Sequence, residues 1–431
     1  MGRWKRVACL RRFAPNHVFV STEFRQHFIH EVRKETQTMA LDFTFTDEQE
    51  FFRQTIRDTV DRLIVPRAQE LDDTEEWPED IWKEFASLGW LGLRHEEGYG
   101  GMNQPVVNQM IFYEELYRGS LGFAMAVTMQ VLMGTYFIKR FANEEIKQRL
   151  LVPAIKGDKK CVICFTEDQS GSDLAGTRTL ATKVDGGWRI NGTKQWVTQG
   201  PLADVATVLC TVDPSQGLKA LNFFLIEKKT EDRDGFVPGQ ILHKVGGRCA
   251  ITGELVLDNV FVPEENLLGE KLNKGVTYAG EILNEVRIMT GMSALAISKC
   301  ALEDCREYAN NRVAFGNPIG NYQLIREKFA RCWAWYEAAR TQCYKCAWMI
   351  DNPDNCGVSP RDLLELCMAA KFHATELCVT TVEEAMRIYG GNSFCTEYPV
   401  QRYWKNAMYA LFGGGTHEVM KDYLGRMYLR K

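Results

Sequence analysis

The chain has 431 residues, of which 45% are hydrophobic and 25% charged, with a formal net charge of −4. This composition is typical of a folded protein of two or three domains and argues against an intrinsically disordered chain. The balanced charge gives no reason to expect a nucleic-acid partner. The longest nearly apolar run, 121–133, is too short to span a bilayer, so no membrane partner is expected either.

The first 38 residues differ from the rest, because they carry eight Lys or Arg against three Glu. An Arg-rich, acid-poor leader is typical of an organelle transit peptide, which would place the protein in the mitochondrial matrix. The alternative is that translation starts at Met39 and that residues 1–38 are a mis-annotated start. The 14 Cys are scattered through a chain with no secretory signal, which favours reduced thiols and a cytoplasmic location.

Helical and strand patterns follow one another along the remaining chain. Apolar spacings of three and four predict helices over 47–90, 108–117, 121–142 and 143–151. Short runs rich in Val, Ile, Thr and Phe then predict strands over 161–166, 181–184, 188–191, 195–198, 205–212 and 221–227, with the β region ending near Gly269. Helices return over about 276–311, 321–351, 359–390 and 397–411.

This order predicts an α+β protein with three domains after the segment 1–38. They are an N-terminal helical domain over 39–160, a middle antiparallel β domain over 161–273, and a C-terminal four-helix bundle over 274–431.

Two Cys-x-x-Cys pairs, Cys161/Cys164 and Cys343/Cys346, have a spacing that can hold zinc or an iron–sulfur cluster. The first pair lies in a strand pattern, where its thiols would face opposite sides, and the second lies in a helix pattern without turn residues. Neither has the loop of a metal-binding knuckle, so we predict no metal site.

Two segments of the β region have the chemistry of a ring-binding site. The turn 166–173 offers backbone N–H groups and hydroxyls to a polar ligand. On a regular strand Trp196 and Thr198 share a face, so an indole could cover a planar ring while a hydroxyl donates to a ring nitrogen, as an isoalloxazine requires. Taken singly, each segment is equally explained as a surface turn or a core strand.

Glycine-rich turns beside the C-terminal helices, at 390–391 and 413–415, could approach a phosphate or simply end a helix. No G-x-G-x-x-G follows a strand, so the sequence does not support a Rossmann site.

Together these segments resemble the acyl-CoA dehydrogenases collinearly from about Phe43 to Tyr428. The shared segments are 96–101 (EEGYGG), 166–173, 196–198 (WVT), Arg312 with 315–316 (FG), 389–392 (YGGN) and 397–400 (EYPV). The resemblance implies a helical–β–helical fold, FAD as cofactor, an acyl-CoA or enoyl-CoA substrate, electron-transferring flavoprotein as partner, and a homotetramer. A heteromeric assembly stays open.

The resemblance also assigns individual residues to the cofactor. Thr166 is expected at the pyrimidine end of the flavin, Trp196 over one face, and Thr198 near N5. The segment around Arg312 is expected to reach the FAD of a neighbouring subunit. The full set of expected FAD-binding residues is Phe165, Thr166, Trp196, Thr198, Arg312, Phe315, Gln323, Arg387, Gly390, Gly391, Thr416 and Glu418.

Some of these positions depart from the family pattern. Arg387 stands where a glutamine is common, and it could pair with a phosphate. The turn 167–173 lacks the usual Pro and Ala but keeps Ser172, which is expected to contact CoA. Arg287 is expected near the substrate.

The largest departure concerns the carboxylate that removes the α-proton in this family. The two positions where members carry it are Gly414 and Val286 here, and neither can transfer a proton. Glu285 is the nearest helix carboxylate, but one residue turns a helix by about 100°, so it would point elsewhere unless the helix bulges. His417 also lies nearby and could titrate. The catalytic residue therefore stays unassigned.

Three functions fit a family member without that base. The chain could act across Cα–Cβ mainly as an enoyl-CoA reductase, somewhat like crotonobetainyl-CoA reductase, which also lacks the C-terminal glutamate but keeps a helix glutamate. It could take its base from an unrecognised position. It could instead perform a flavin-assisted non-redox reaction, or be a catalytically silent FAD- and CoA-binding subunit.

Overall fold

The computed structural model describes residues 44–228, 235–269 and 271–430. The predicted leader, residues 1–38, lies outside these ranges. The described residues up to Glu50 belong to a separate unit, and the chain from Phe51 onward forms another, which the following paragraphs describe.

Helices make up the first part of the described chain, and the first of them, α3, begins before Phe51. Their bounds are α3 (Asp47–Leu63), α4 (Ala68–Thr74), α5 (Glu79–Ser87), α6 (Val106–Leu116), α7 (Leu121–Thr128), a π-helical turn (Met129–Gly134), α8 (Thr135–Phe141), α9 (Glu144–Ile146) and α10 (Val152–Ile155). Among the described residues, Leu121–Phe141 alone is long and apolar enough to cross a membrane, and 89% of its most apolar window is buried inside the protein. It is a central core helix of this domain.

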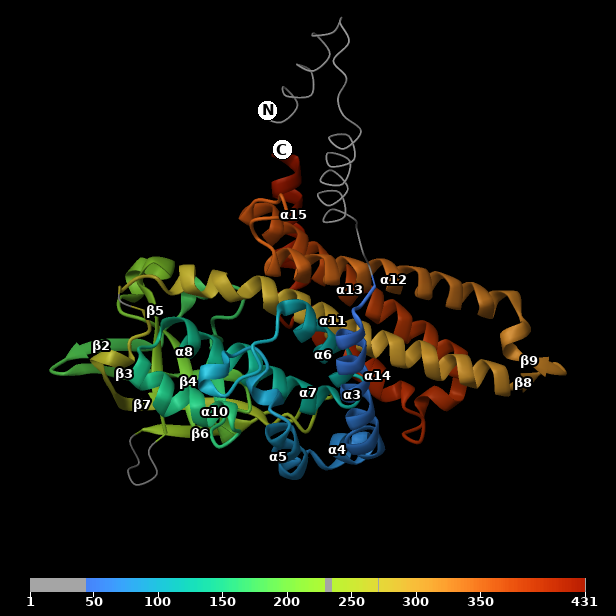
Figure 1. Ribbon diagram of the computed structural model, residues 1–431, viewed down its shortest axis with the longest axis horizontal. Helices are drawn as coiled ribbons and strands as arrows, with labels where there is room; N and C mark the ends of the chain where they lie inside the picture. Colours follow the sequence, from blue (N-terminus) through green and yellow to red (C-terminus); the bar gives the residue numbers. More distant parts are fainter. Residues whose placement is uncertain (1–43, 229–234, 270, 431) are drawn as a thin grey trace, which may run out of the picture. The chain divides into compact units, whose positions relative to one another are not determined.

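Seven strands form one sheet, which lies on the left in Figure 1. They are β1 (Cys161–Cys164), β2 (Leu180–Val184), β3 (Gly187–Thr198), β4 (Val205–Thr211), β5 (Leu221–Glu227), β6 (Phe236–Ile241) and β7 (Thr252–Pro263). The order is β1-β4-β2-β3-β7-β6, with β5 also paired to β4. The predicted segments 188–191 and 195–198 are one strand, β3.

The sheet is not wholly antiparallel, which corrects the sequence-based prediction. β1 runs parallel to β4, with Cys161 opposite Val205, and β2 meets the end of β4 in parallel. The long segment between β1 and β4, which includes β2 and β3, supplies the crossover that a parallel pair needs. The other four pairings are antiparallel as expected.

The C-terminal part consists of α11 (Gly275–Asn311), α12 (Gln323–Asp351), α13 (Pro360–Tyr389), α14 (Val400–Ala407) and α15 (His417–Leu429). α11 packs against α12, α13, α14 and α6. Figure 1 shows it running from the sheet to the hairpin of β8 (Val313–Ala314) and β9 (Asn317–Pro318) at the opposite end. α15 begins where Thr416 accepts a hydrogen bond from the Val419 N–H, so the bundle has a fifth helix that the sequence pattern did not indicate.

The four cysteines of the two Cys-x-x-Cys pairs are all free and buried. Cys161 and Cys164 lie in β1, and Cys343 and Cys346 lie in α12.

Candidate functional site

The turn after β1 lies beside the Trp196 segment. The backbone N–H of Gln195 donates to the carbonyl oxygen of Thr166 at 2.8 Å, and Lys194 Nζ donates to the carbonyl of Phe165 at 3.1 Å. The structure therefore brings together Phe165, Thr166 and Trp196, which the sequence assigned to one ring-binding site.

A β-bulge changes how Trp196 is presented. The register of β3 against β7 shifts between Lys194 and Val197, and Trp196 takes a left-handed backbone with φ 57°. The prediction of strict alternation is wrong at this point, because the extra residue lets Val197 occupy the core while the indole of Trp196 stays 56% exposed. Bulges commonly aim a side chain at a functional site in this way.

The side chain of Gln199, beside the bulge, has no hydrogen-bond partner among the described residues. Thr198 is buried at 8% exposure, and the next residue, Gln199, has both side-chain polar atoms buried without a hydrogen bond. An exposed indole next to a hydroxyl and an unpartnered amide fits a planar ring with polar edges. The residues present thus fit the flavin ring of FAD.

A buried ion pair fixes the turn to the sheet. Lys194, which is 0% exposed, donates from Nζ to Glu167 Oε1 at 2.7 Å. The same carboxylate accepts from Thr179 Oγ1 at 2.6 Å and from the Arg178 N–H at 2.8 Å. Burial opposes ionisation of Glu167, but Lys194 holds the pKa of this carboxyl below its usual value. Sequence reasoning missed Lys194, because β3 has several polar residues and no local feature marks this lysine as buried.

The remaining cofactor residues lie at the far end of α11. Arg312 ends this helix, and the side chain of Phe315 in the following hairpin is 96% exposed. The 37 residues of α11 span about 55 Å at 1.5 Å per residue. Arg312 therefore lies about 55 Å from the start of this helix, which contacts β5 of the sheet.

Arg387 and the glycine turn after it are also in this C-terminal part. The Arg387 guanidinium pairs with Glu384 at 3.1 Å, so in this chain it meets a carboxylate where a phosphate was expected. Gly390 has φ 59°, and an added Cβ at Gly390 or Gly391 would meet nothing within 4 Å. The turn is therefore open to a ligand. Ser172 and Glu418, expected near CoA and near FAD respectively, are both exposed.

Gly414 and Val286, the two positions of the usual base, meet in space. A Cβ built on Gly414 would lie 3.5 Å from Val286 Cγ1 and 2.8 Å from Thr290 Oγ1. Gly414 has φ 69°, a conformation that favours glycine. We call the space between Gly414, Val286 and Thr290 the base slot. None of the three residues has a titratable side chain.

Glu285 does not reach the base slot. Its carboxylate is 3.0 Å from Arg94 Nη2, an interaction that spans 191 positions of the sequence. His417 is also engaged elsewhere: it is 3% exposed and hydrogen-bonds Thr375 at 2.5 Å. Burial, together with Lys371, lowers its pKa, so His417 is a neutral packing residue near pH 7.

A buried lysine and a half-buried arginine lie near the base slot. Lys371 is 0% exposed, and its Nζ donates to the carbonyl of Gly415 at 2.9 Å. Burial and the neighbouring Arg287 lower the pKa of Lys371 to about 8. Burial also lowers the pKa of Arg287, whose Nε and Nη1 have no hydrogen-bond partner among the described residues. The surroundings of the slot therefore favour an anion.

Comparison with known proteins covers nearly the whole described chain. Residues 46–158 match the N-terminal domain of acyl-CoA dehydrogenases, 162–260 their middle domain and 273–429 their C-terminal domain. Benzylmalonyl-CoA dehydrogenase of Aromatoleum aromaticum is 37% identical over 88% of this chain and 98% of its own length.

Solved structures agree with this match. Butyryl-CoA dehydrogenase from Megasphaera elsdenii superimposes with a TM-score of 0.84 at 32% identity, over 90% of this chain and 100% of that one. An acyl-CoA dehydrogenase complexed with FAD from Bacillus anthracis gives 0.81 at 29% identity, over 90% of this chain and 67% of that one.

Proposed function

Because the chain belongs to the acyl-CoA dehydrogenase family, we propose that it oxidises an α-carboxylated acyl-CoA across Cα–Cβ, with loss of the carboxylate as CO2. Its membership makes it an FAD-dependent oxidoreductase of the acyl-CoA dehydrogenase type. The α-carboxylate is the finer part of the proposal, and it is argued from the base slot.

The observation that carries the proposal is a base slot without an acid. Gly414 and Val286, the two positions that the family resemblance assigns to the carboxylate that removes the α-proton, meet here beside Thr290. Loss of a general base costs about 10²–10⁴ in rate, so ordinary proton abstraction would be slow here. A substrate that forms its α-carbanion in another way does not need the missing residue.

A malonyl thioester forms the carbanion by losing CO2. The bond between Cα and the carboxyl carbon breaks, and its electron pair stays on Cα. That pair forms the Cα=Cβ double bond as hydride leaves Cβ, so no proton has to be removed. When bound, FAD supplies the acceptor for this hydride. A relative named benzylmalonyl-CoA dehydrogenase supports this substrate class.

This chain's own residues would bind and orient FAD and the acyl-CoA substrate. Trp196, Thr198 and Thr166 would hold the ring of FAD, and Ser172 would contact CoA. The carboxylate of the substrate would lie near Gly414, with Arg287 and Lys371 nearby to favour its negative charge.

We propose that the site is completed by a neighbouring copy of the chain. Arg312 lies at the far end of α11, about 55 Å from the end that contacts β5, and Phe315 and Gln323 follow it, so the three would serve the FAD of that neighbour. A homotetramer satisfies this requirement, with electron-transferring flavoprotein as the electron acceptor and a cytoplasmic location.

A matched pair of thioesters tests the proposed reaction. Benzylmalonyl-CoA and 3-phenylpropionyl-CoA differ only in the α-carboxylate. We expect anaerobic holoenzyme to bleach its flavin with the first and release one CO2 per flavin, and to react about 10²–10⁴ more slowly with the second. Equal rates, or bleaching without CO2, would contradict decarboxylation.

The second candidate is an enoyl-CoA reductase, which the same empty slot favours because Cα can be protonated by water. Reduced enzyme that is reoxidised by cinnamoyl-CoA, while the oxidised form ignores both saturated thioesters, would establish that direction. A colourless protein that binds no FAD would support a silent subunit.

A further inference from the structure

A second polar cluster lies beside the base slot, between the N-terminal helices and α11. It joins Arg94, in the loop after the turn Trp90–Gly92, to Tyr113 of α6 and Glu285 of α11. Arg94 and Glu285 are each 8% exposed, and Tyr113 is 0% exposed. The cluster is therefore as deeply buried as the apolar core around it.

The hydrogen-bonding capacity of this cluster is only partly used. One nitrogen of Arg94, Nη2, meets the carboxylate of Glu285 at 3.1 Å. Arg94 Nε and Nη1 and the hydroxyl of Tyr113 have no hydrogen-bond partner among the described residues, although the Arg94 guanidinium lies 5.0 Å from the centre of the Tyr136 ring. Buried donors without hydrogen bonds are rare in native proteins, so several together make this cluster a candidate for binding a polar group of a ligand.

The loop that carries Arg94 is held in place. The carbonyl of Arg94 accepts from Lys139 Nζ at 2.9 Å, and the neighbouring His95 ring bonds Thr135 at 2.9 Å. A Cβ on Gly101 would lie 2.1 Å from the carbonyl oxygen of His95, so only glycine permits the close approach of this turn. The guanidinium is thus presented by a fixed loop, as a binding group requires.

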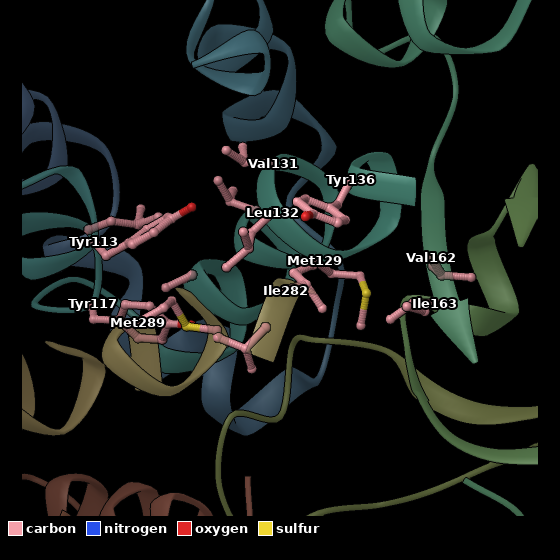
Figure 2. Close-up of a cluster of buried hydrophobic side chains, with 14 of the residues drawn as sticks. Tyr113, Tyr117, Met129, Val131, Leu132, Tyr136, Val162, Ile163, Ile282 and Met289 are labelled. Atoms are coloured by element: carbon pink, nitrogen blue, oxygen red, sulfur yellow. The ribbon is translucent and has the colours of Figure 1, made fainter. Parts of the chain in front are cut away.

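The cluster adjoins the base slot through α11. Val286 faces Gly414, while Glu285, one residue earlier, shares the adjoining face of the helix with Ile282 and Met289. Figure 2 shows Ile282 and Met289 in one apolar group with Tyr113 and the side chains of the Met129–Gly134 turn. An acyl substituent that leaves the base slot along this face would be covered by apolar side chains, with one polar point at Arg94 and Tyr113.

We propose that Arg94, Tyr113 and Glu285 bind an uncharged group that both accepts and donates hydrogen bonds, such as a hydroxyl, on the apolar substituent of the acyl-CoA. The inference rests on the proposed function, because it assumes an acyl-CoA in this site. It goes beyond that function because it names the chemical group at the far end of the substrate.

The charges of the cluster select the class of ligand. Arg94 and Glu285 already neutralise each other, so a second carboxylate or an ammonium would bring an unbalanced charge into the core. A hydroxyl brings none: it can accept from Arg94 or Tyr113 and donate to Glu285. A plain alkyl or phenyl group would leave these donors unpaired, which is how a polar site rejects an apolar analogue.

Binding to the oxidised holoenzyme tests this selection without requiring turnover. The probes are 3-phenylpropionyl-CoA and its 2-, 3- and 4-hydroxyphenyl analogues, titrated against the visible spectrum of the flavin. We expect one isomer to bind about 10-fold more tightly than the parent compound. No preference for any isomer, with all four still perturbing the flavin, would overturn the inference and leave the proposed function standing. If none of the four perturbed the flavin, the proposed acyl-CoA site itself would fail.

The variant Tyr113→Phe assigns the preference to this cluster. Removing one hydroxyl should reduce the preference to about 2-fold. Tyr117→Phe is the matched control, because the Tyr117 hydroxyl lies in the same apolar group but already bonds Thr128 at 2.9 Å. It should leave the preference intact. A Tyr113→Phe protein that keeps the full preference would overturn the assignment.

Discussion

Two lysines that are completely buried distinguish the two halves of the site. Lys194 in β3 meets the carboxylate of Glu167 and the carbonyl of Phe165, so its charge is balanced within the chain. Among the described residues, Lys371 in α13 donates a hydrogen bond to the carbonyl of Gly415 and faces the positive charge of Arg287, with Glu418 and Glu376 as weaker opposing charges. The charge of the cofactor side is balanced within the chain, whereas in our proposal the slot side is completed by an anionic ligand.

Placing a carboxylate in the base slot should supply the proton acceptor that this half of the site lacks. Because a Cβ at Gly414 would meet Thr290 Oγ1 at 2.8 Å, the change needs both Gly414→Glu and Thr290→Ala. The double variant gains a carboxylate in the place where relatives use it, and we expect it to oxidise 3-phenylpropionyl-CoA about 10²–10⁴ faster than the parent protein. Anaerobic stopped-flow bleaching of the flavin measures this rate.

The single variant Thr290→Ala is the control for this gain, and it should leave the rate unchanged. If the double variant is no faster than this control, the slot is not where the α-proton is taken.

Breaking the buried ion pair on the cofactor side should lower the free energy of unfolding. Lys194→Met leaves Glu167 buried without its cation, and we expect the free energy of unfolding to fall by about 3–5 kcal/mol with loss of bound FAD. Urea unfolding followed by circular dichroism and by flavin release checks both effects.

Lys183→Met is the matched control on the neighbouring strand, β2. Lys183 pairs with Glu264, and both side chains are more than half exposed, so the loss should be below about 1 kcal/mol. Similar losses for the two variants would show that the buried pair has no special role.

On the slot side, replacing Lys371 should change the free energy of unfolding by a smaller amount, and this amount should depend on pH. Burial and Arg287 lower the pKa of Lys371 from 10.5 to about 8, so between these values the unfolded chain binds a proton that the folded chain does not. This group therefore adds stability as pH rises from about 8 to 10.5. The stability of the parent protein relative to Lys371→Met should increase over that range in urea titrations, and a constant difference would contradict the lowered pKa.

Local patterns determine the helices closely, because their ends carry strong signals. The predicted ranges 276–311, 321–351 and 359–390 differ from α11, α12 and α13 by at most two residues at either end. Ser359 and Pro360 illustrate why: a hydroxyl cap and a proline in the first turn define a helix start in the sequence itself. The strands β6 and β7 and the helix α15 have no such clear signals, and they were not assigned.

The parts of the site that depend on local sequence motifs or on family resemblance could be predicted. The parts that depend on contacts between distant segments could not. The meeting of Gly414 and Val286 followed from two independent motif positions. The bulge at Trp196 did not, because period-two alternation contains no information on an extra residue. Arg94 and Glu285 are 191 positions apart, and no local sequence feature of either residue indicates that they pair.

The continuity of α11 has a consequence for how this protein can vary. One uninterrupted helix carries the slot residue Val286, the buried face with Glu285, and Arg312 at its far end. Inserting or deleting a single residue between these points would turn everything beyond it by about 100° and displace it by about 1.5 Å. Side chains along this helix can therefore be exchanged one at a time, but its residue count is fixed by geometry.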